Sequence, residues 1–199
     1  MIKNRCGCKM KIGLFFGSFN PIHIGHLIIA DTMATDTDID RVWFVVSPQN
    51  PFKKNNSLLH EFDRLTMVER AIAENYRLQA SDVEFSLPRP SYTIDTLTVL
   101  SDKYPEHEFV LIMGEDNLVQ FKNWKNYEKL LEFFPIYVYP RPDTPPHDFS
   151  DHPGITFIQA PLLDISATYI RKRIQEHREI RYLVTEPVEA LIRLKKYYL

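Results

Sequence analysis

Ten residues near the N-terminus, Gly17-Ser18-Phe19-Asn20-Pro21-Ile22-His23-Ile24-Gly25-His26, join a short apolar run to a segment of helical periodicity. The apolar run, residues 12–16, predicts a buried parallel strand, while Ile24, Leu27 and Ile28 have helical spacing. A helix N-terminus presents unpaired N–H groups and the positive end of the helix dipole. The sequence therefore predicts a binding site for nucleotide phosphates where this strand passes into the helix.

Two histidines of this stretch, His23 and His26, lie three positions apart, a spacing that puts both on one face of a helix. A neutral imidazole donates a hydrogen bond and an imidazolium neutralises charge, and both suit a phosphorus centre that gains negative charge during displacement. Gly17 allows the backbone to approach a ligand closely. The alternative is an accidental pair, with one histidine capping the helix and the other in solvent. The strand-turn-helix context favours the phosphate site.

At these residues the chain resembles the nucleotidylyltransferase superfamily, whose signature is Gly-(Gly/Ser)-Phe-Asp-Pro-x-(His/Thr)-x-Gly-His. Asn20 stands where Asp is the more usual residue, and Asn also suits a tight turn before proline. The resemblance implies that His23 and His26 are catalytic. It also implies that both histidines bind ATP, together with Gly17, Ser18 and Phe19.

The composition is that of an ordinary globular protein, with 44% apolar residues, 25% charged residues and a formal net charge of -2 over 199 residues. This length fits one domain, which we expect to span residues 10–199 after a flexible extension at residues 1–9. Cys6 and Cys8 lack a second pair that would complete a zinc site, so we expect free thiols.

The charge balance gives no electrostatic case for nucleic-acid binding. No apolar run reaches the roughly 18 residues that a membrane span needs, and the N-terminus lacks the apolar core of a signal peptide. We therefore expect a cytoplasmic protein that binds neither nucleic acid nor a membrane.

Further apolar runs alternate with helical patterns along the chain. Strands are predicted over residues 42–46, 78–87, 109–113, 136–139 and 156–159. The alternation predicts an α/β fold, a single Rossmann-like open parallel sheet with helices on both faces and a small helical C-terminal part. Each motif follows the carboxyl end of a strand, where ligands of such folds bind. The stretch 141–154 is rich in Pro, Asp and His, and we expect it to be mobile or disordered.

A second phosphate-binding element is predicted near the C-terminus. Ser166 is a good N-cap for a helix over residues 166–175, and Arg171 lies within two turns of its start, where a guanidinium fits a β- or γ-phosphate. The alternative is a solvent-exposed arginine beside Lys172 and Arg173. The stretch Ile165-Ser166-Ala167-Thr168-Tyr169-Ile170-Arg171 is similar to the superfamily's second signature, Ile-Ser-Ser-Thr-x-(Ile/Val)-Arg. That similarity implies that Ser166, Thr168 and Arg171 bind ATP and that Arg171 is catalytic.

Two further stretches and one single residue are similar to bacterial nicotinate-nucleotide adenylyltransferases. They are Arg89-Pro90-Ser91-Tyr92-Thr93, Gly114-Glu115-Asp116-Asn117-Leu118, and Trp124. Trp124 would stack on a pyridine ring, the alternative being a packing role. Asp116 would accept hydrogen bonds from ribose, or simply cap a helix. The similarity implies ATP binding by Gly114 and Asp116. It implies nicotinate mononucleotide binding by Asn50, Lys53, Tyr92, Thr93, Leu118 and Trp124, with Lys53 alternatively a solvated loop lysine.

The resemblance implies adenylyl transfer from ATP to nicotinate mononucleotide, giving nicotinate adenine dinucleotide and pyrophosphate in NAD biosynthesis. Magnesium would bridge ATP phosphates, and the sequence contains no carboxylate cluster that suggests dedicated metal ligands. One alternative is an adenylyltransferase for nicotinamide mononucleotide or phosphopantetheine, and another is a non-catalytic nucleotide-binding regulator. The sequence leaves open whether the chain forms a homo-oligomer.

Overall fold

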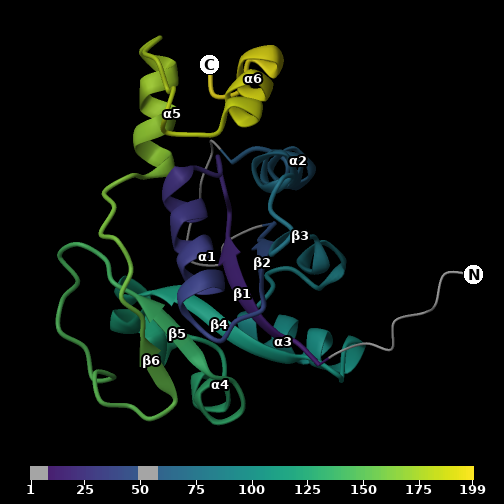
Figure 1. The fold of residues 1–199 in the computed structure, drawn as a ribbon, viewed down its shortest axis with the longest axis vertical. Helices are drawn as coiled ribbons and strands as arrows, with labels where there is room; N and C mark the ends of the chain where they lie inside the picture. Colours follow the sequence, from purple (N-terminus) through teal and green to yellow (C-terminus); the bar gives the residue numbers. More distant parts are fainter. Residues whose placement is uncertain (1–8, 49–57) are drawn as a thin grey trace, which may run out of the picture.

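The computed structural model describes residues 9–48 and 58–199. Its centre is a parallel sheet with the strand order β3-β2-β1-β4-β5-β6 (Figure 1). The strands are β1 (Lys11–Gly17), β2 (Arg41–Val46), β3 (Leu78–Ser81), β4 (Glu108–Gly114), β5 (Ile136–Tyr139) and β6 (Ile155–Phe157). This topology confirms the predicted Rossmann-like α/β fold.

Helices cover both faces of the sheet and form the C-terminal end of the chain (Figure 1). The α-helices are α1 (Ile24–Asp36), α2 (Glu61–Ile72), α3 (Thr93–Lys103), α4 (Tyr127–Phe133), α5 (Ala167–Gln175) and α6 (Glu186–Lys195). Two 3-10 helices, η1 (Val83–Ser86) and η2 (Glu115–Asn123), follow β3 and β4. Helix α6 packs against α2, which ties the C-terminal part to the sheet layer.

Alternate residues of the central strands point to opposite faces of the sheet, as the two-residue period of a strand requires. Phe15 belongs to the hydrophobic core that contains residues of α1, α2 and α6. Ile12 and Leu14 belong to the core on the other face, beneath α3 and α4. Because both faces are buried, these strands are continuous apolar runs rather than alternating ones.

The chain passes from β1 to β2 and β3 on one side of the sheet and then returns to β4 on the other side of β1. The carboxyl ends of β1 and β4 therefore form a topological switch point, where ligands of open parallel sheets bind. Helix α1 starts directly beyond the end of β1, so its N-terminus faces this point.

Two regions differ from the sequence-based expectation. The strand predicted over residues 78–87 ends at Ser81, because the following residues form η1, which directs Glu84 into the interior at 3% exposure. The stretch 141–154, expected to be mobile, is anchored in its middle. Phe149 is 6% exposed and packs edge-on against Phe121 in the second core.

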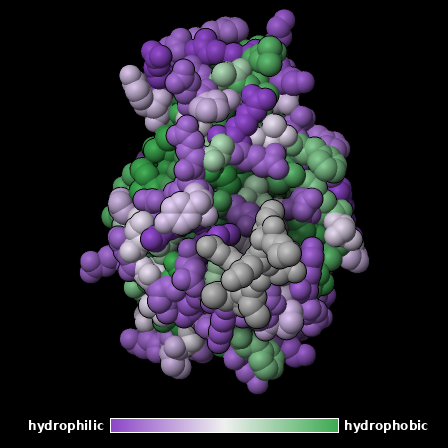
Figure 2. Space-filling view, turned by 45° about the vertical axis from the view of Figure 1, so that its right-hand side comes forward, coloured by the Kyte–Doolittle hydropathy of each residue, from purple (hydrophilic) through white to green (hydrophobic). Residues whose placement is uncertain are grey.

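The face shown in Figure 2 carries hydrophilic side chains over most of its surface, with apolar side chains between them. Within the described residues, no helix is long and apolar enough to cross a membrane. Cys6 and Cys8 lie outside the described residues.

Candidate active site

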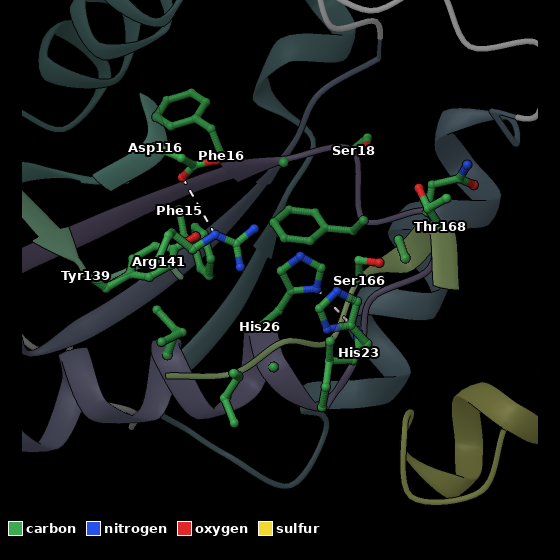
Figure 3. A pocket seen from close by; sticks show the side chains of 18 of the residues that line it. Phe15, Phe16, Ser18, His23, His26, Asp116, Tyr139, Arg141, Ser166 and Thr168 are labelled. Atoms are coloured by element: carbon green, nitrogen blue, oxygen red, sulfur yellow. Dashed lines mark hydrogen bonds and ion pairs between the residues drawn. The ribbon is translucent and has the colours of Figure 1, made fainter. Parts of the chain in front are cut away.

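A cavity of about 350 Å³ opens at the switch point of the sheet (Figure 3). Its walls come from the end of β1, the start of α1, the segments that follow β4 and β5, and the start of α5. Nine of the ten residues predicted to bind ATP line this cavity: Gly17, Ser18, Phe19, His23, His26, Asp116, Ser166, Thr168 and Arg171. The structure thus brings together residues that lie far apart in the sequence.

Gly114 is the predicted ATP-binding residue that does not line the cavity. A Cβ atom at this position would lie 2.5 Å from Asp116 Oδ1, so glycine is needed for the Asp116 side chain to turn back over the backbone. The role of Gly114 in this structure is therefore to make room for Asp116.

The loop between β1 and α1 is built around Phe19. Its backbone has φ of 44°, and its ring is buried against Phe15, Phe44 and the edge of His26. A Cβ atom at Gly17 would lie 2.8 Å from Phe19 Cζ, so only glycine leaves space for this ring. The Phe19 ring therefore packs against His26, and Phe19 also lines the cavity.

The two histidines are stacked on one another, with ring centroids 3.7 Å apart. His23 is the N-cap of α1, and its backbone N–H donates to Nδ1 of His26 over 3.3 Å. A Cβ atom at Gly25 would lie 3.1 Å from Nδ1 of His23, so this glycine leaves room for the His23 ring. The pair therefore occupies one side of the helix start, as its spacing predicted.

Both imidazoles are held in the neutral form. Burial, with a smaller effect of the Arg141 charge, lowers the pKa of His23 from 6.5 to about 4. The pKa of His26 is also lowered, by burial first and then by the charges of His23 and Arg141. Nδ1 of His23 is buried against Gly25 and has no hydrogen-bond partner among the described residues, an unusual state for a buried polar atom.

Arg141 is a site residue that the sequence reasoning missed. In Figure 3 the histidine pair lies between Arg141 on one side and Ser166 and Thr168 on the other. The Arg141 Nε atom lies 3.6 Å from Asp116 Oδ1, and the guanidinium lies over the ring of Tyr139. Arg141 follows β5 at the carboxyl edge of the sheet, so the rule that located the other motifs would have found it.

Helix α5 places Ser166, Thr168 and Arg171 at the cavity. Ser166 caps α5, and its Oγ accepts a hydrogen bond from the backbone N–H of Tyr169. Arg171 Nη1 donates to the carbonyl oxygen of Asn20 at 2.7 Å, and its Nη2 donates to Thr168 Oγ1 at 3.1 Å. Arg171 is therefore directed toward the histidine loop, and the alternative of a solvated arginine patch does not hold.

Asn20, the departure from the superfamily signature, is 1% exposed. Its Oδ1 accepts from the hydroxyl of Tyr198 at 2.9 Å and from the backbone N–H of Leu59 at 3.3 Å. An amide satisfies these donors without placing a negative charge in the interior. The second-last residue of the chain thus helps to hold the loop that carries the histidines.

The described residues predicted to bind nicotinate mononucleotide, Tyr92, Thr93, Leu118 and Trp124, do not line the histidine cavity. Tyr92 is the N-cap of α3 and Thr93 its first residue, and Trp124 packs against Phe121 at the end of η2. Leu118 is 1% exposed and its side chain is part of the second core, so its binding of the mononucleotide stays a prediction that would involve its backbone. Asn50 and Lys53 lie outside the described residues.

Two neutral imidazoles and an arginine at the switch point of a parallel sheet, next to a helix N-terminus, form the arrangement of a nucleotidylyltransferase. Sequence comparison agrees, because the model of the cytidylyltransferase-like family matches residues 14–173.

The chain is 65% identical to the probable nicotinate-nucleotide adenylyltransferase of Cytophaga hutchinsonii, covering 95% of this chain and 98% of the relative. It is 50% identical to the probable nicotinate-nucleotide adenylyltransferase of Flavobacterium psychrophilum, over 95% of this chain and 99% of the relative. The fold matches the nicotinic acid mononucleotide adenylyltransferase of Plasmodium falciparum complexed with NaAD, with a TM-score of 0.79, 20% identity and coverage of 95% and 97%. The chain belongs to the nicotinate-nucleotide adenylyltransferases of the cytidylyltransferase-like family.

Proposed function

We propose that this protein transfers the adenylyl group of ATP to nicotinate mononucleotide, giving nicotinate adenine dinucleotide and pyrophosphate in NAD biosynthesis. The names of the relatives, which match over nearly the whole chain, support the choice of acceptor. The observation that carries the chemistry is the stacked pair of His23 and His26 at the start of α1, inside the cavity that Arg171 also lines.

In this reaction a phosphate oxygen of the mononucleotide attacks the α-phosphorus of ATP. A new P–O bond forms while the bond from the α-phosphorus to the bridging oxygen breaks, and that oxygen leaves with pyrophosphate. The acceptor phosphate is already ionised at neutral pH, so neither a protein nucleophile nor a general base is needed. Catalysis then consists of positioning the two phosphates and stabilising the charge that develops between them.

The histidine pair would bind phosphate oxygens at the reacting centre. Nδ1 of His26 accepts a hydrogen bond from the His23 backbone, so the proton of the neutral His26 ring lies on Nε2. That N–H is a donor for a non-bridging oxygen of the α-phosphate. The start of α1 adds the positive end of the helix dipole.

Two arginines would bind the remaining phosphates. Arg171 uses one N–H on Asn20 and one on Thr168, and its other N–H groups remain for the leaving pyrophosphate. Arg141, on the opposite wall, supplies a second guanidinium. Asp116 would accept hydrogen bonds from a ribose hydroxyl, and the same carboxylate keeps Arg141 in place.

For the acceptor we propose a pocket formed by Tyr92, Thr93 and Trp124, with Trp124 stacking on the pyridine ring. Leu118 would contribute through its backbone only, because its side chain is in the core. Asn50 and Lys53 are proposed, from the resemblance alone, to bind the phosphate of the mononucleotide.

Magnesium is proposed as a companion of ATP rather than a resident of the protein. Among the described residues, no cluster of three or more His, Cys, Asp or Glu side chains could hold a metal ion. Asp116 is the one carboxylate of the described chain that lines the cavity, and it is paired with Arg141. Phosphate oxygens and water would therefore supply most ligands, as magnesium commonly requires, and the ion would neutralise part of the triphosphate charge.

The test is pyrophosphate release from ATP and Mg²⁺ with nicotinate mononucleotide, nicotinamide mononucleotide or phosphopantetheine as the acceptor. We expect turnover with nicotinate mononucleotide far above that with the other two. His26→Ala, at equal folding, should lower kcat by about 100-fold, the usual loss on removing one donor to a developing charge. Turnover with only one of the other two acceptors would show that this acceptor, and not nicotinate mononucleotide, is the substrate. Tight ATP binding without turnover would favour a nucleotide-binding regulator.

A further inference from the structure

Arg64 of α2 is the largest fully buried side chain of the described structure, at 0% exposure, and it does not line the cavity. Its guanidinium donates to four backbone carbonyl oxygens. Nε donates to Leu59 at 2.9 Å, Nη1 donates to Ser18 at 2.6 Å and to Ser47 at 2.8 Å, and Nη2 donates to Pro48 at 3.0 Å. A single side chain thus connects three separate segments of the chain.

One of these segments carries the histidines that are proposed to bind ATP. Ser18 belongs to the loop that carries the histidine pair, and Ser47 and Pro48 follow the end of β2. No carboxylate among the described residues lies within ion-pair distance of Arg64. Burying a charged group without an opposite charge is costly, so four hydrogen bonds must offset the loss of hydration. The planar fork of five N–H donors fits four carbonyls at once, whereas a lysine ammonium has only three donors.

We infer that Arg64 is a positioning residue for adenylyl transfer: through the carbonyl oxygens of Ser18, Ser47 and Pro48 it fixes the histidine loop against the end of β2. This inference rests on the proposed function, in which ATP lies against the histidine loop. In-line attack requires the two reacting atoms to be about 3 to 3.5 Å apart, and a displacement of about 1 Å costs on the order of 100-fold in rate. Arg64 itself touches neither substrate.

The experiment compares Arg64→Lys and Arg64→Met with the wild type by kcat, by KM for each substrate and by the thermal midpoint. We expect both variants to lose about 100-fold in kcat, with KM changing by less than about threefold, because the loops are displaced while their contacts to substrate remain. Lysine should not rescue the loss, because it keeps the charge but not the planar fork. Ile72→Ala, a core substitution on the same helix, is the control for lost stability without any change at the carbonyls.

Two outcomes would overturn the inference: wild-type kcat in Arg64→Lys, or a loss of kcat in Ile72→Ala equal to that in the arginine variants. A wild-type protein without turnover would instead overturn the proposed function, and this inference with it.

Discussion

Acid should destabilise this protein through a buried imidazole, and the effect can be isolated by His23→Asn. His23 caps α1 in a buried position, where its pKa is lowered from 6.5 to about 4. Asparagine is a good helix N-cap and does not titrate in this range, so the variant removes the proton-binding group while it keeps the cap. The change of stability with pH in the two proteins therefore measures the burial of His23.

The sign and size of the effect follow from proton linkage. Between pH 6.5 and 4 the unfolded chain binds a proton on His23 and the folded chain does not, so protonation favours unfolding. The wild type keeps its full stability above pH 6.5 and loses it progressively as the pH falls toward 4. Lowering the pKa from 6.5 to about 4 corresponds to a loss of about 3 kcal/mol in the free energy of unfolding at acid pH. The total free energy of unfolding of a typical domain is about 5 to 15 kcal/mol, so this loss is a large share of it.

Urea unfolding of both proteins at a series of pH values between 7.5 and about 4.5 measures this difference. We expect the stability of the wild type relative to His23→Asn to fall by about 2 to 3 kcal/mol over the range. His26 and the carboxylates titrate in both proteins, so much of their effect cancels in the difference. Parallel curves for the two proteins would show that His23 titrates normally and would refute its assignment as a buried neutral group.

Three further outcomes are expected. Arg141→Gln removes a cation that lowers the pKa of both histidines, so NMR titration should show both pKa values raised, and unchanged values would remove Arg141 as a cause. Trp124→Ala should raise KM for nicotinate mononucleotide about tenfold or more with little change in kcat, whereas an unchanged KM would assign Trp124 to packing. Tyr198→Phe removes the hydroxyl that donates to Asn20, and chemical denaturation should show a loss of about 1 kcal/mol of unfolding free energy; no loss would mean that water replaces the bond.

Most of the fold was predictable because the strands and helices leave local patterns in the sequence. A strand buried on both faces is a short apolar run, and the runs at residues 12–16, 42–46 and 109–113 all lie in strands. The error at residues 78–87 has a physical cause. Nothing local distinguishes a strand residue from Glu84, whose burial depends on hydroxyls of Ser91 and Thr96, later in the chain.

The site was predictable where a motif places a charged or polar group at a strand end, as with His23, His26 and Arg171. It was not predictable where the partner is a backbone carbonyl from a distant segment. Arg64 donates to carbonyls 46 and 17 positions earlier in the chain, and any residue type could supply those oxygens. Leu118 shows why an apolar residue next to a motif is hard to assign from sequence, because its side chain lies in the second core while its predicted contact with the mononucleotide stays untested.

The charges around the cavity explain why neutral histidines suit this chemistry. Arg141 and Arg171 line the described walls with only Asp116 to oppose them, so a bound triphosphate completes the charge balance. Two permanent imidazoliums would bind pyrophosphate tightly in the ground state and slow its release. In the proposed mechanism, neutral rings would instead act as hydrogen-bond donors whose interaction strengthens as charge develops on the phosphate. Their binding energy would then stabilise the transition state more than either nucleotide, which is the condition for a high kcat.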